Sequence, residues 1–335
     1  MATIHDVARQ AQVSAATVSR VLNGRPNVDP ALVVRVRQAM ADLDYEPNAV
    51  ARNLRRSSTT LWAVIISDVG NPFFTALVRG VEDVAQQAGY SVVLCNTDED
   101  PAKEDRYLQV ALAEKMAGVI ISSSGRASRV DQLIQSDTPV VAIDRQLRNA
   151  NVDTVLVDNE HGAEIATTHL IEAGYRHVAC IGGPRRLSTA AQRLRGYQRA
   201  LRTHRMPYDE RLVRQADFRE DGGYKAMQSL LDQDAQPDAV FVVNNLMTIG
   251  AVQCLLDRGV RIPQQIGIVG FDEIPWAHLI RPPLSTVSQP TYELGRTAAL
   301  LLAERIKSPS RPPSTVTLPT QLCERASSSR RPHRR

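Results

Sequence analysis

The stretch "SAATVSRVLNG" (residues 14–24) determines how the N-terminal part of the chain is interpreted. Ser14 is a favourable N-cap residue, and the valine and leucine side chains that follow fall on one face of the helix it would begin. Asn23 and Gly24 are typical of a helix end. The stretch therefore predicts a short amphipathic helix whose second face is not used in the core and is open to a partner molecule.

The residues on either side predict two more helices. Thr3 and Asp6 have the spacing of a capping box, which indicates a helix that ends near residue 11. Only "QVS" separates that helix from the one capped by Ser14. Asp29 followed by proline would begin a third helix ending near residue 43. Helix, tight turn and helix is the order of a helix-turn-helix, whose second helix enters the major groove of DNA.

The outer face of the second helix carries residue types that suit DNA. The side chains predicted on this face are Ala15, Ala16, Ser19 and Arg20. Arginine can pair with two acceptors of a guanine, and alanine can contact a thymine methyl group. The hydroxyls suited to phosphate contacts are those of Ser14, Thr17 and Ser19. On spacing alone, a plain three-helix bundle with an exposed arginine remains an alternative.

Charge is distributed unevenly along the 335 residues, which carry a net charge of +4. Residues 1–60 hold eight arginines against five acidic residues, and residues 324–335 hold five arginines against one. The middle of the chain is therefore net negative. A basic N-terminal module is typical of nucleic-acid binding, although a charge of this size alone does not decide it.

Several protein classes are disfavoured by what the sequence lacks. It has no run of 18 apolar residues and no secretory signal, so we expect a cytoplasmic protein without a membrane partner. The four cysteines are far apart, as expected of reduced thiols. Phosphate-binding, dinucleotide-binding, zinc-protease and serine-hydrolase motifs do not occur. We therefore expect neither an enzyme nor a bound cofactor or metal.

From residue 61, apolar strand-like runs alternate with helical stretches. One series of four runs begins with "LWAVIIS" (61–67), and a second series begins with "TVLVD" (154–158). Continuous apolar strands alternating with helices indicate parallel sheets covered on both faces. Two series predict two α/β lobes, with a ligand cleft at the carboxyl ends of the strands. The fold class expected is an all-α headpiece plus a two-lobed α/β core.

Polar and aromatic side chains follow these strands, where the cleft should open. The candidates for ligand contact are Ser67, Asn71, Phe73, Phe74, Asp144, Arg145, Phe218, Asn244, Asp272 and Gln289. Each has an ordinary structural alternative: a turn at Asn71-Pro72, a surface ion pair at Asp144-Arg145, core filling at Phe218. Together they favour a polar ligand with apolar faces, because charged groups hydrogen-bond hydroxyls and phenyl rings cover C–H faces.

The first 54 residues resemble the headpiece of the LacI/GalR family of bacterial transcription regulators. The resemblance extends through "NPFFTALVRGVED" (71–83), "RLRGY" (193–197), "VGFDEI" (269–274) and "LSTVSQPTYELG" (284–295). It implies a homodimer bound to a near-palindromic DNA operator, with residues 15, 16 and 20 at bases. The residues that it adds to the DNA-binding set are Thr3, Asn23, Asn48, Ala51, Leu54 and Arg55.

The resemblance also implies that "PNAVARNL" (47–54) folds as a hinge helix on DNA. Leu54 matches the apolar wedge that this family inserts into the minor groove. The segment is too short to be a stable helix alone, which agrees with folding on DNA. Arg55 and the neighbouring arginines would contact phosphates, while a solvent-exposed linker leucine is the alternative for Leu54.

The pocket residues resemble the sugar site of ribose-binding transport proteins, and "NPFFTALVRGVED" and "GYSVVLCNT" (89–97) resemble ribose-operon repressors of this family. The resemblance adds Arg193 to the ligand-binding set. It implies a repressor of a sugar-utilisation operon with a small sugar, ribose favoured, as effector. The family usually has Asn-Asp where this chain has Asn244-Asn245, so an amide replaces a carboxylate in the local hydrogen bonding.

Other readings remain open at this point. The effector could be another hexose, a sugar acid or a purine; the ligand could act as a corepressor; or the chain could be a transport receptor. The absence of leucine heptads near the C-terminus favours a dimer. The domains expected are a headpiece (1–46), a hinge helix and linker (47–60), a two-lobed effector-binding and dimerisation core (61–325; lobe 1 at 61–159 and 290–319, lobe 2 at 160–289 and 320–325) and a disordered basic tail (326–335).

Overall fold

A computed structural model describes residues 2–22, 27–45, 59–124, 130–147, 151–233 and 236–330. The chain divides into two compact units, Met1–Thr59 and Thr60–Arg335. Each unit has its own core and is described separately below.

The described residues of the first unit form three helices, α1 (Ile4–Gln10), α2 (Ala15–Leu22) and α3 (Pro30–Asp42). The predicted start signals are confirmed: Thr3 and Asp6 form a capping box on α1, and Asp29 caps α3 with proline in its first turn. A small core holds the helices together. Its buried members are Val7, Ala8, Ala11, Val18, Val36 and Ala39.

Lobe 1 of the second unit contains a six-stranded parallel sheet in the order β11-β5-β4-β3-β1-β2. The strands are β1 (Leu61–Ile66), β2 (Ser91–Asn96), β3 (Gly118–Ile121), β4 (Val140–Ile143), β5 (Asp153–Val157) and β11 (Thr315–Leu318). The helices are α5 (Pro72–Gln87), α6 (Pro101–Ala113), α7 (Val130–Gln135) and α12 (Thr291–Lys307).

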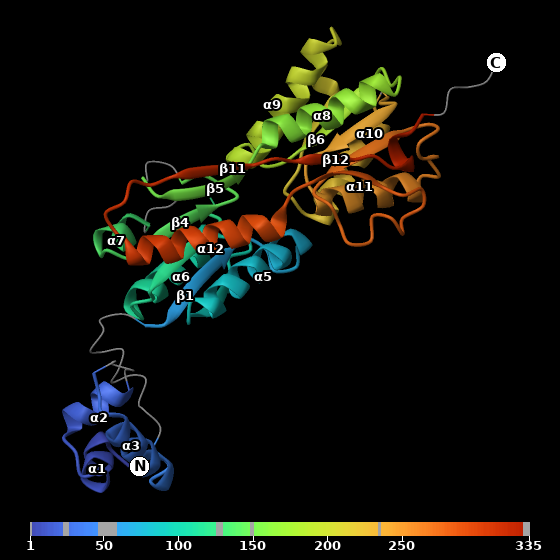
Figure 1. Cartoon of the computed structure of the whole chain (residues 1–335). Helices are drawn as coiled ribbons and strands as arrows, with labels where there is room; N and C mark the ends of the chain where they lie inside the picture. Colours follow the sequence, from blue (N-terminus) through green and yellow to red (C-terminus); the bar gives the residue numbers. More distant parts are fainter. Residues whose placement is uncertain are drawn as a thin grey trace. The chain divides into compact units, whose positions relative to one another are not determined.

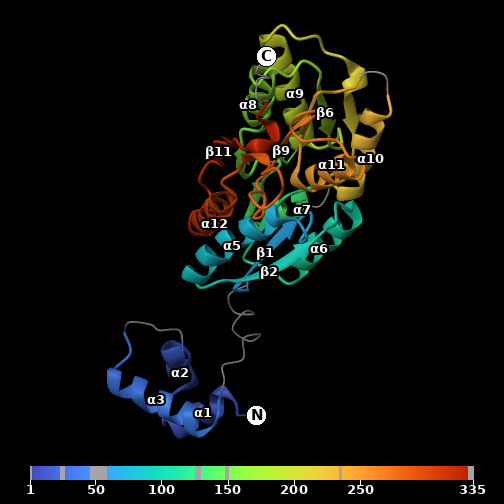
Figure 2. The same ribbon diagram turned by 90° about the vertical axis from the view of Figure 1, so that its right-hand side faces the viewer.

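Alternation along β1 explains how this sheet is covered on both faces. Trp62, Val64 and Ile66 join the core beneath α5 and α12. Ala63 and Ile65 point the other way, into the core beneath α6 and α7. Figure 2 shows β1 and β2 between α5 and α6. An unbroken apolar run is therefore required, because neither face of the strand meets water.

Lobe 2 repeats the plan with the order β12-β10-β9-β8-β6-β7, in which only the pairing of β10 with β12 is antiparallel. The strands are β6 (Val178–Gly182), β7 (Val213–Gln215), β8 (Ala239–Val242), β9 (Gly267–Phe271), β10 (Ser285–Ser288) and β12 (Gln321–Cys323). The helices are α8 (Asn159–Glu172), α9 (Ser188–Thr203), α10 (Glu220–Leu231) and α11 (Asn245–Asp257), and the 3-10 turn η1 spans Glu210–Leu212. The predicted fold class is confirmed.

Three chain segments pass between the lobes, after β5, after β10 and after β11. Helix pairs pack closely within each lobe: α12 lies along α5 and α8 along α9 (Figure 1). Gly295 permits the first contact, because a Cβ there would lie 1.9 Å from the Leu77 carbonyl oxygen. Each lobe is thus held together by contacts between helices that belong to different segments of the chain.

The expectation of a disordered tail from residue 326 is wrong for the residues that the structure describes. Ala326–Ser328 forms a 3-10 turn, η2, and Ser327 and Ser328 are buried. The Ser327 hydroxyl donates to the Ile268 carbonyl (2.8 Å), and the Ser328 hydroxyl bonds to that of Ser285 (2.7 Å). The prediction of disorder rests on the polar composition of the tail. It is wrong here because the Ser327 and Ser328 hydroxyls form hydrogen bonds with residues of the lobe 2 sheet.

Candidate functional site

The start of the first helix is fixed by Thr3, which the sequence assigns to the DNA-binding set. Its backbone N–H donates to Asp6 Oδ2 (2.9 Å), and its hydroxyl donates to the same oxygen (2.7 Å). The backbone N–H of Asp6 donates back to the Thr3 hydroxyl (3.3 Å). These hydrogen bonds lower the pKa of Asp6.

The second helix, α2, presents only part of its predicted outer face. Ser14 caps it as predicted: the Thr17 N–H donates to the Ser14 hydroxyl (3.1 Å), and the two hydroxyls lie 2.9 Å apart. Ala16 and Arg20 are exposed, and Thr17 and Ser19 are half-buried. Ala15 is half-buried against the small core, so its expected place on the open face is wrong in part.

Five members of the predicted DNA-binding set lie outside the described residues. They are Asn23, Asn48, Ala51, Leu54 and Arg55. Their assignment stays a prediction.

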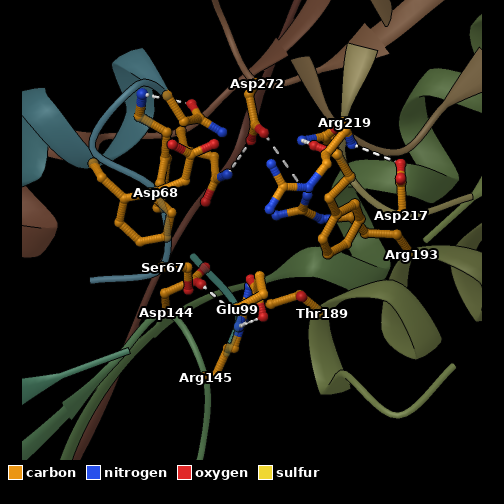
Figure 3. A pocket seen from close by; sticks show the side chains of 16 residues that line it. Ser67, Asp68, Glu99, Asp144, Arg145, Thr189, Arg193, Asp217, Arg219 and Asp272 are labelled. Carbon is orange, nitrogen blue, oxygen red and sulfur yellow. Dashed lines mark hydrogen bonds and ion pairs between the residues drawn. The ribbon is translucent and has the colours of Figure 1, made fainter. Parts of the chain in front are cut away.

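All eleven predicted ligand-binding residues line one pocket between the lobes of the second unit. The pocket contains about 550 Å³ of space that protein atoms do not fill, part of it open to solvent. Figure 3 shows two charged groups across it: Asp272 with Arg193, and Asp144 and Glu99 with Arg145. Ten of these residues are predicted from strand ends and Arg193 from the family resemblance, and the structure brings them together from positions 67 to 289.

Three lining residues have the left-handed backbone that non-glycine residues rarely adopt. They are Asp144, Phe218 and Asp272, with φ of 65°, 67° and 74°. Asp144 and Asp272 come directly after β4 and β9, and Phe218 follows β7 by three residues. The unusual φ turns the chain at each position, and all three residues line the pocket. Gly183 makes room for one of them, since a Cβ there would lie 2.1 Å from the Phe218 ring.

The first charged group is centred on Arg145. Its two terminal nitrogens donate to the two carboxylate oxygens of Glu99 at 2.5 and 3.0 Å, and one of them also donates to the Ser123 carbonyl (3.2 Å). Arg145 Nε lies 3.4 Å from Asp144 Oδ2. Asp144 also accepts from the Ser122 hydroxyl (3.2 Å). The surface ion pair that the sequence left open is excluded, because Asp144 and Arg145 are both buried.

The second charged group is centred on Arg193 in α9. Its Nε donates to Asn159 (2.8 Å), and one terminal nitrogen donates to the Val243 carbonyl (2.7 Å) and lies 3.9 Å from Asp272 Oδ2. The guanidinium carbon lies 3.8 Å from the centre of the Phe271 ring. Gln289 donates to Asp272. Arg193 is therefore held rigidly, with its charge balanced by Asp272.

Burial dominates the ionisation of these groups. Desolvation raises the pKa of Asp144 and of Asp272 despite their arginine partners. Desolvation likewise lowers the pKa of Arg193. For Arg145, desolvation is outweighed by Glu99 and Asp144, and its pKa is raised. The carboxylates of Asp144 and Asp272 are thus poorly solvated, which favours hydrogen bonds from a ligand.

Three buried polar atoms of the pocket lack a hydrogen-bond partner among the described residues. They are Ser67 Oγ, Arg145 Nε and Gln289 Oε1, on residues that are 2%, 5% and 6% exposed. Buried polar groups are nearly always paired, so unpaired ones in a cavity indicate a ligand that donates and accepts. Hydroxyl groups do both. Beside these atoms, Phe73 and Phe74 pack edge to face with ring centres 5.0 Å apart.

Asn71 and Asn245 form an amide pair that bridges the two lobes. The Asn71 amide nitrogen donates to Asn245 Oδ1 (3.1 Å), and the Asn245 amide nitrogen donates to Asn71 Oδ1 (2.8 Å). Asn71 also caps α5, and Asn244 caps α11. The asparagine at position 245 therefore has a structural role, because its amide both donates and accepts here, whereas an ionised carboxylate would only accept.

The sequence interpretation missed five lining residues: Asp68, Glu99, Thr189, Asp217 and Arg219. Asp68 follows Ser67 directly, and Asp217 and Arg219 flank Phe218, so the strand-end signal already pointed to them. Glu99 follows β2 by three residues and could have been found in the same way. Thr189 carries no such signal, since it lies one turn before Arg193 at the start of α9.

Within the described residues, no group of histidine, cysteine or carboxylate side chains could hold a metal ion. No helix in that part of the chain is long and apolar enough to cross a membrane.

Two family models match the chain. Residues 3–48 match "Bacterial regulatory proteins, lacI family", and residues 59–326 match "Periplasmic binding proteins and sugar binding domain of LacI family". The chain belongs to the LacI family of bacterial regulators. A relative in Halalkalibacterium halodurans, a ribose operon repressor, is 38% identical over 97% of this chain and 96% of its own length.

Solved structures agree in fold. The Lac repressor dimer bound to operator and an anti-inducer is 26% identical, with a TM-score of 0.86 over 98% of this chain and 99% of that one. A complex of the regulator CelR with cellobiose is 34% identical, with a TM-score of 0.75 over 98% and 100%. A LacI-family regulator from Enterococcus faecium with bound ribose is 29% identical, with a TM-score of 0.72 over 80% and 98%. The relatives named here are transcriptional regulators, not enzymes.

Proposed function

We propose that this LacI-family repressor controls a sugar-utilisation operon and that ribose is its effector. A homodimer binds a near-palindromic operator, with Ala16 and Arg20 of each α2 at base edges and Ser14, Thr17 and Ser19 at phosphates. Residues 47–54, which lie outside the described residues, complete the interface as a hinge helix with Leu54 as the wedge. The Lac repressor dimer bound to operator supports this arrangement by its similarity.

The set of unpaired atoms at Ser67, Arg145 and Gln289 carries the effector proposal. Together with Asp144 and Asp272, they offer both donors and acceptors to a ring of hydroxyl groups, and Phe73, Phe74 and Phe218 offer apolar faces. A ribose operon repressor and a ribose-bound regulator among the relatives favour ribose within this class. The cellobiose complex of CelR makes a disaccharide the second candidate.

Ribose is proposed to release the operator. Coupling between two such sites is typically about 1–3 kcal/mol, which is a change of about 5–150-fold in operator affinity. The test begins with thermal unfolding of the full chain with ribose, other pentoses, hexoses, cellobiose, sugar acids and purines. A ligand at about 100 times its Kd adds about 2.7 kcal/mol to the free energy of unfolding, which is easily seen.

Operator sites selected from a random duplex library then give the second readout. Ribose should raise the Kd for the selected site and leave binding to unselected DNA unchanged. Stabilisation by a purine or cellobiose alone would overturn ribose and keep the repressor. Tighter operator binding with ribose would keep the effector and reverse the sign of control.

A further inference from the structure

The interior of the pocket has an excess of negative charge. Three carboxylates, those of Glu99, Asp144 and Asp272, face only two guanidinium groups, those of Arg145 and Arg193. Nearer the solvent, the pocket is lined by one more guanidinium, that of Arg219, and by two more carboxylates, those of Asp68 and Asp217. Neither layer of the pocket therefore offers a net positive charge.

Glu99 is the residue that creates this excess. Its carboxylate covers both terminal nitrogens of Arg145, while Asp144 lies against Nε of the same guanidinium. The positive charge of Arg145 is thus balanced twice. The Arg145 and Glu99 side chains are 6% and 19% exposed, so water screens this arrangement only weakly.

The Glu99 side chain is not needed to hold its own turn. Asp98 accepts from Lys103 and from the Asn96 amide (2.8 Å), and Asp100 caps α6 through the Ala102 N–H (2.8 Å). The loop is therefore fixed by the residues on both sides of Glu99. The two hydrogen bonds from Arg145 hold the Glu99 carboxylate in the pocket.

We propose that Glu99 is a specificity-determining residue that restricts the pocket to neutral polyhydroxylated ligands and rejects sugar acids and sugar phosphates. A carboxylate or phosphate in the pocket would add negative charge to a site that already has an excess of it. It would also find the guanidinium of Arg145 already neutralised by Glu99 and Asp144. A neutral polyol instead accepts from the Nε–H of Arg145, which lies 3.4 Å from Asp144 Oδ2 but makes no hydrogen bond among the described residues, and it donates to Asp144. This inference rests on the proposed effector pocket and narrows its ligand class.

The test compares charge-matched variants of the full chain. Glu99→Gln keeps the size and one acceptor for Arg145 but removes the charge. Glu99→Asp keeps the charge. Glu114→Gln removes one carboxylate from an exposed position at the end of α6 and serves as the control. Isothermal titration measures the Kd of each protein for ribose, ribitol, ribonate and ribose 5-phosphate.

The wild-type protein should bind ribose, and it should bind ribonate and ribose 5-phosphate at least roughly tenfold more weakly than ribose. A difference of this size is expected of one extra charge in a poorly screened site. Glu99→Gln should gain roughly tenfold or more in affinity for the two anions, with ribose changed by no more than about threefold. Glu99→Asp and Glu114→Gln should remain selective against the anions.

Two outcomes would overturn the role of Glu99 while the proposed function stands. In the first, all variants bind ribose and Glu99→Gln still rejects the anions. In the second, Glu114→Gln gains as much affinity for the anions as Glu99→Gln does. Loss of all four ligands in Glu99→Gln alone would assign the residue a structural role and overturn the proposal too. A wild-type protein that binds ribonate or ribose 5-phosphate more tightly than ribose would overturn both the neutral ligand class and the ribose proposal. Binding of none of the four by any protein would count against the effector pocket itself.

Discussion

The candidate DNA-binding face and the effector pocket are built in opposite ways. The first comes from one short helix and its cap, Ser14 to Arg20, and its key side chains Ala16 and Arg20 are exposed. The second is assembled from strand ends between residues 67 and 289, and most of its polar groups are buried. A charge on the exposed face is solvated and acts mainly when DNA arrives. A charge in the pocket is poorly screened and interacts with its neighbours before any ligand enters.

This contrast predicts that pocket substitutions cost more than headpiece substitutions and that each leaves the other function intact. The chain divides into two compact units at residues 59–60, so a change in one core should not unfold the other. The variants below test that separation, beginning with the largest expected effect.

Asp272→Ala should give the largest loss. It leaves the buried guanidinium of Arg193 without its carboxylate, and removing one partner of a buried ion pair costs about 3–5 kcal/mol. Ribose binding measured by titration should fall by at least about a hundredfold, and the second unit should unfold at a lower temperature. Operator affinity without sugar should be retained, so that the variant represses and no longer responds.

Asp272→Asn serves as the milder variant, because it keeps the bond with Gln289 and removes only the charge. It should bind ribose with an affinity between those of wild type and Asp272→Ala. Equal loss of operator binding and ribose binding in both variants would contradict the independence of the two units.

Arg20→Ala should cost about 1–3 kcal/mol on the selected operator and relax the preference for guanine at the contacted position. Arg20 is exposed and does not belong to the small core, so the substitution should not change thermal stability. Competition binding against operators with single base changes provides the measurement. Arg56→Ala, at a position outside the described residues, should instead weaken binding to all sequences alike. Equal losses on operator and random DNA for Arg20→Ala would contradict base reading.

Ser14→Ala should destabilise the headpiece by about 1 kcal/mol, because the Thr17 N–H loses its side-chain acceptor. Hydrogen exchange of α2 amides in the full chain reports this loss directly. Ser14→Asp is the control, since it restores an acceptor at the helix N-terminus and should recover the protection. If the Ser14 hydroxyl also contacts phosphate, operator affinity should fall in Ser14→Ala and stay low in Ser14→Asp. Recovery of both amide protection and operator affinity in Ser14→Asp would limit the role of Ser14 to capping.

The same contrast explains what could be predicted from the sequence. The caps at Thr3, Ser14 and Asp29 are local signals, and they were confirmed because each needs only three or four neighbouring residues. Pocket membership could be predicted as well, since parallel strands bring their carboxyl ends together whatever the loops between them. The contacts within the pocket could not: Glu99 meets Arg145 across 46 positions, and nothing near either residue encodes that pair. Ser327 and Ser328 were misjudged for the same reason, because their partners lie in distant strands.

Asn245→Asp should have the smallest effect and restores the Asn-Asp pair that the family usually has at positions 244–245. A carboxylate at 245 can still accept from the Asn71 amide and from the Leu246 N–H (2.8 Å in the present structure), but it cannot donate to Asn71 Oδ1. One hydrogen bond between the lobes is lost, worth about 0.5–1.5 kcal/mol. If the amide pair holds the lobes ready for the ligand, ribose affinity should fall by about 2–13-fold. Gln253→Glu, on the exposed side of α11, makes the same change of amide to carboxylate without touching lobe 1 and should leave ribose affinity unchanged. A tighter ribose complex in Asn245→Asp would mean that the amide pair opposes binding, because Asn71 must then leave Asn245 to reach the sugar.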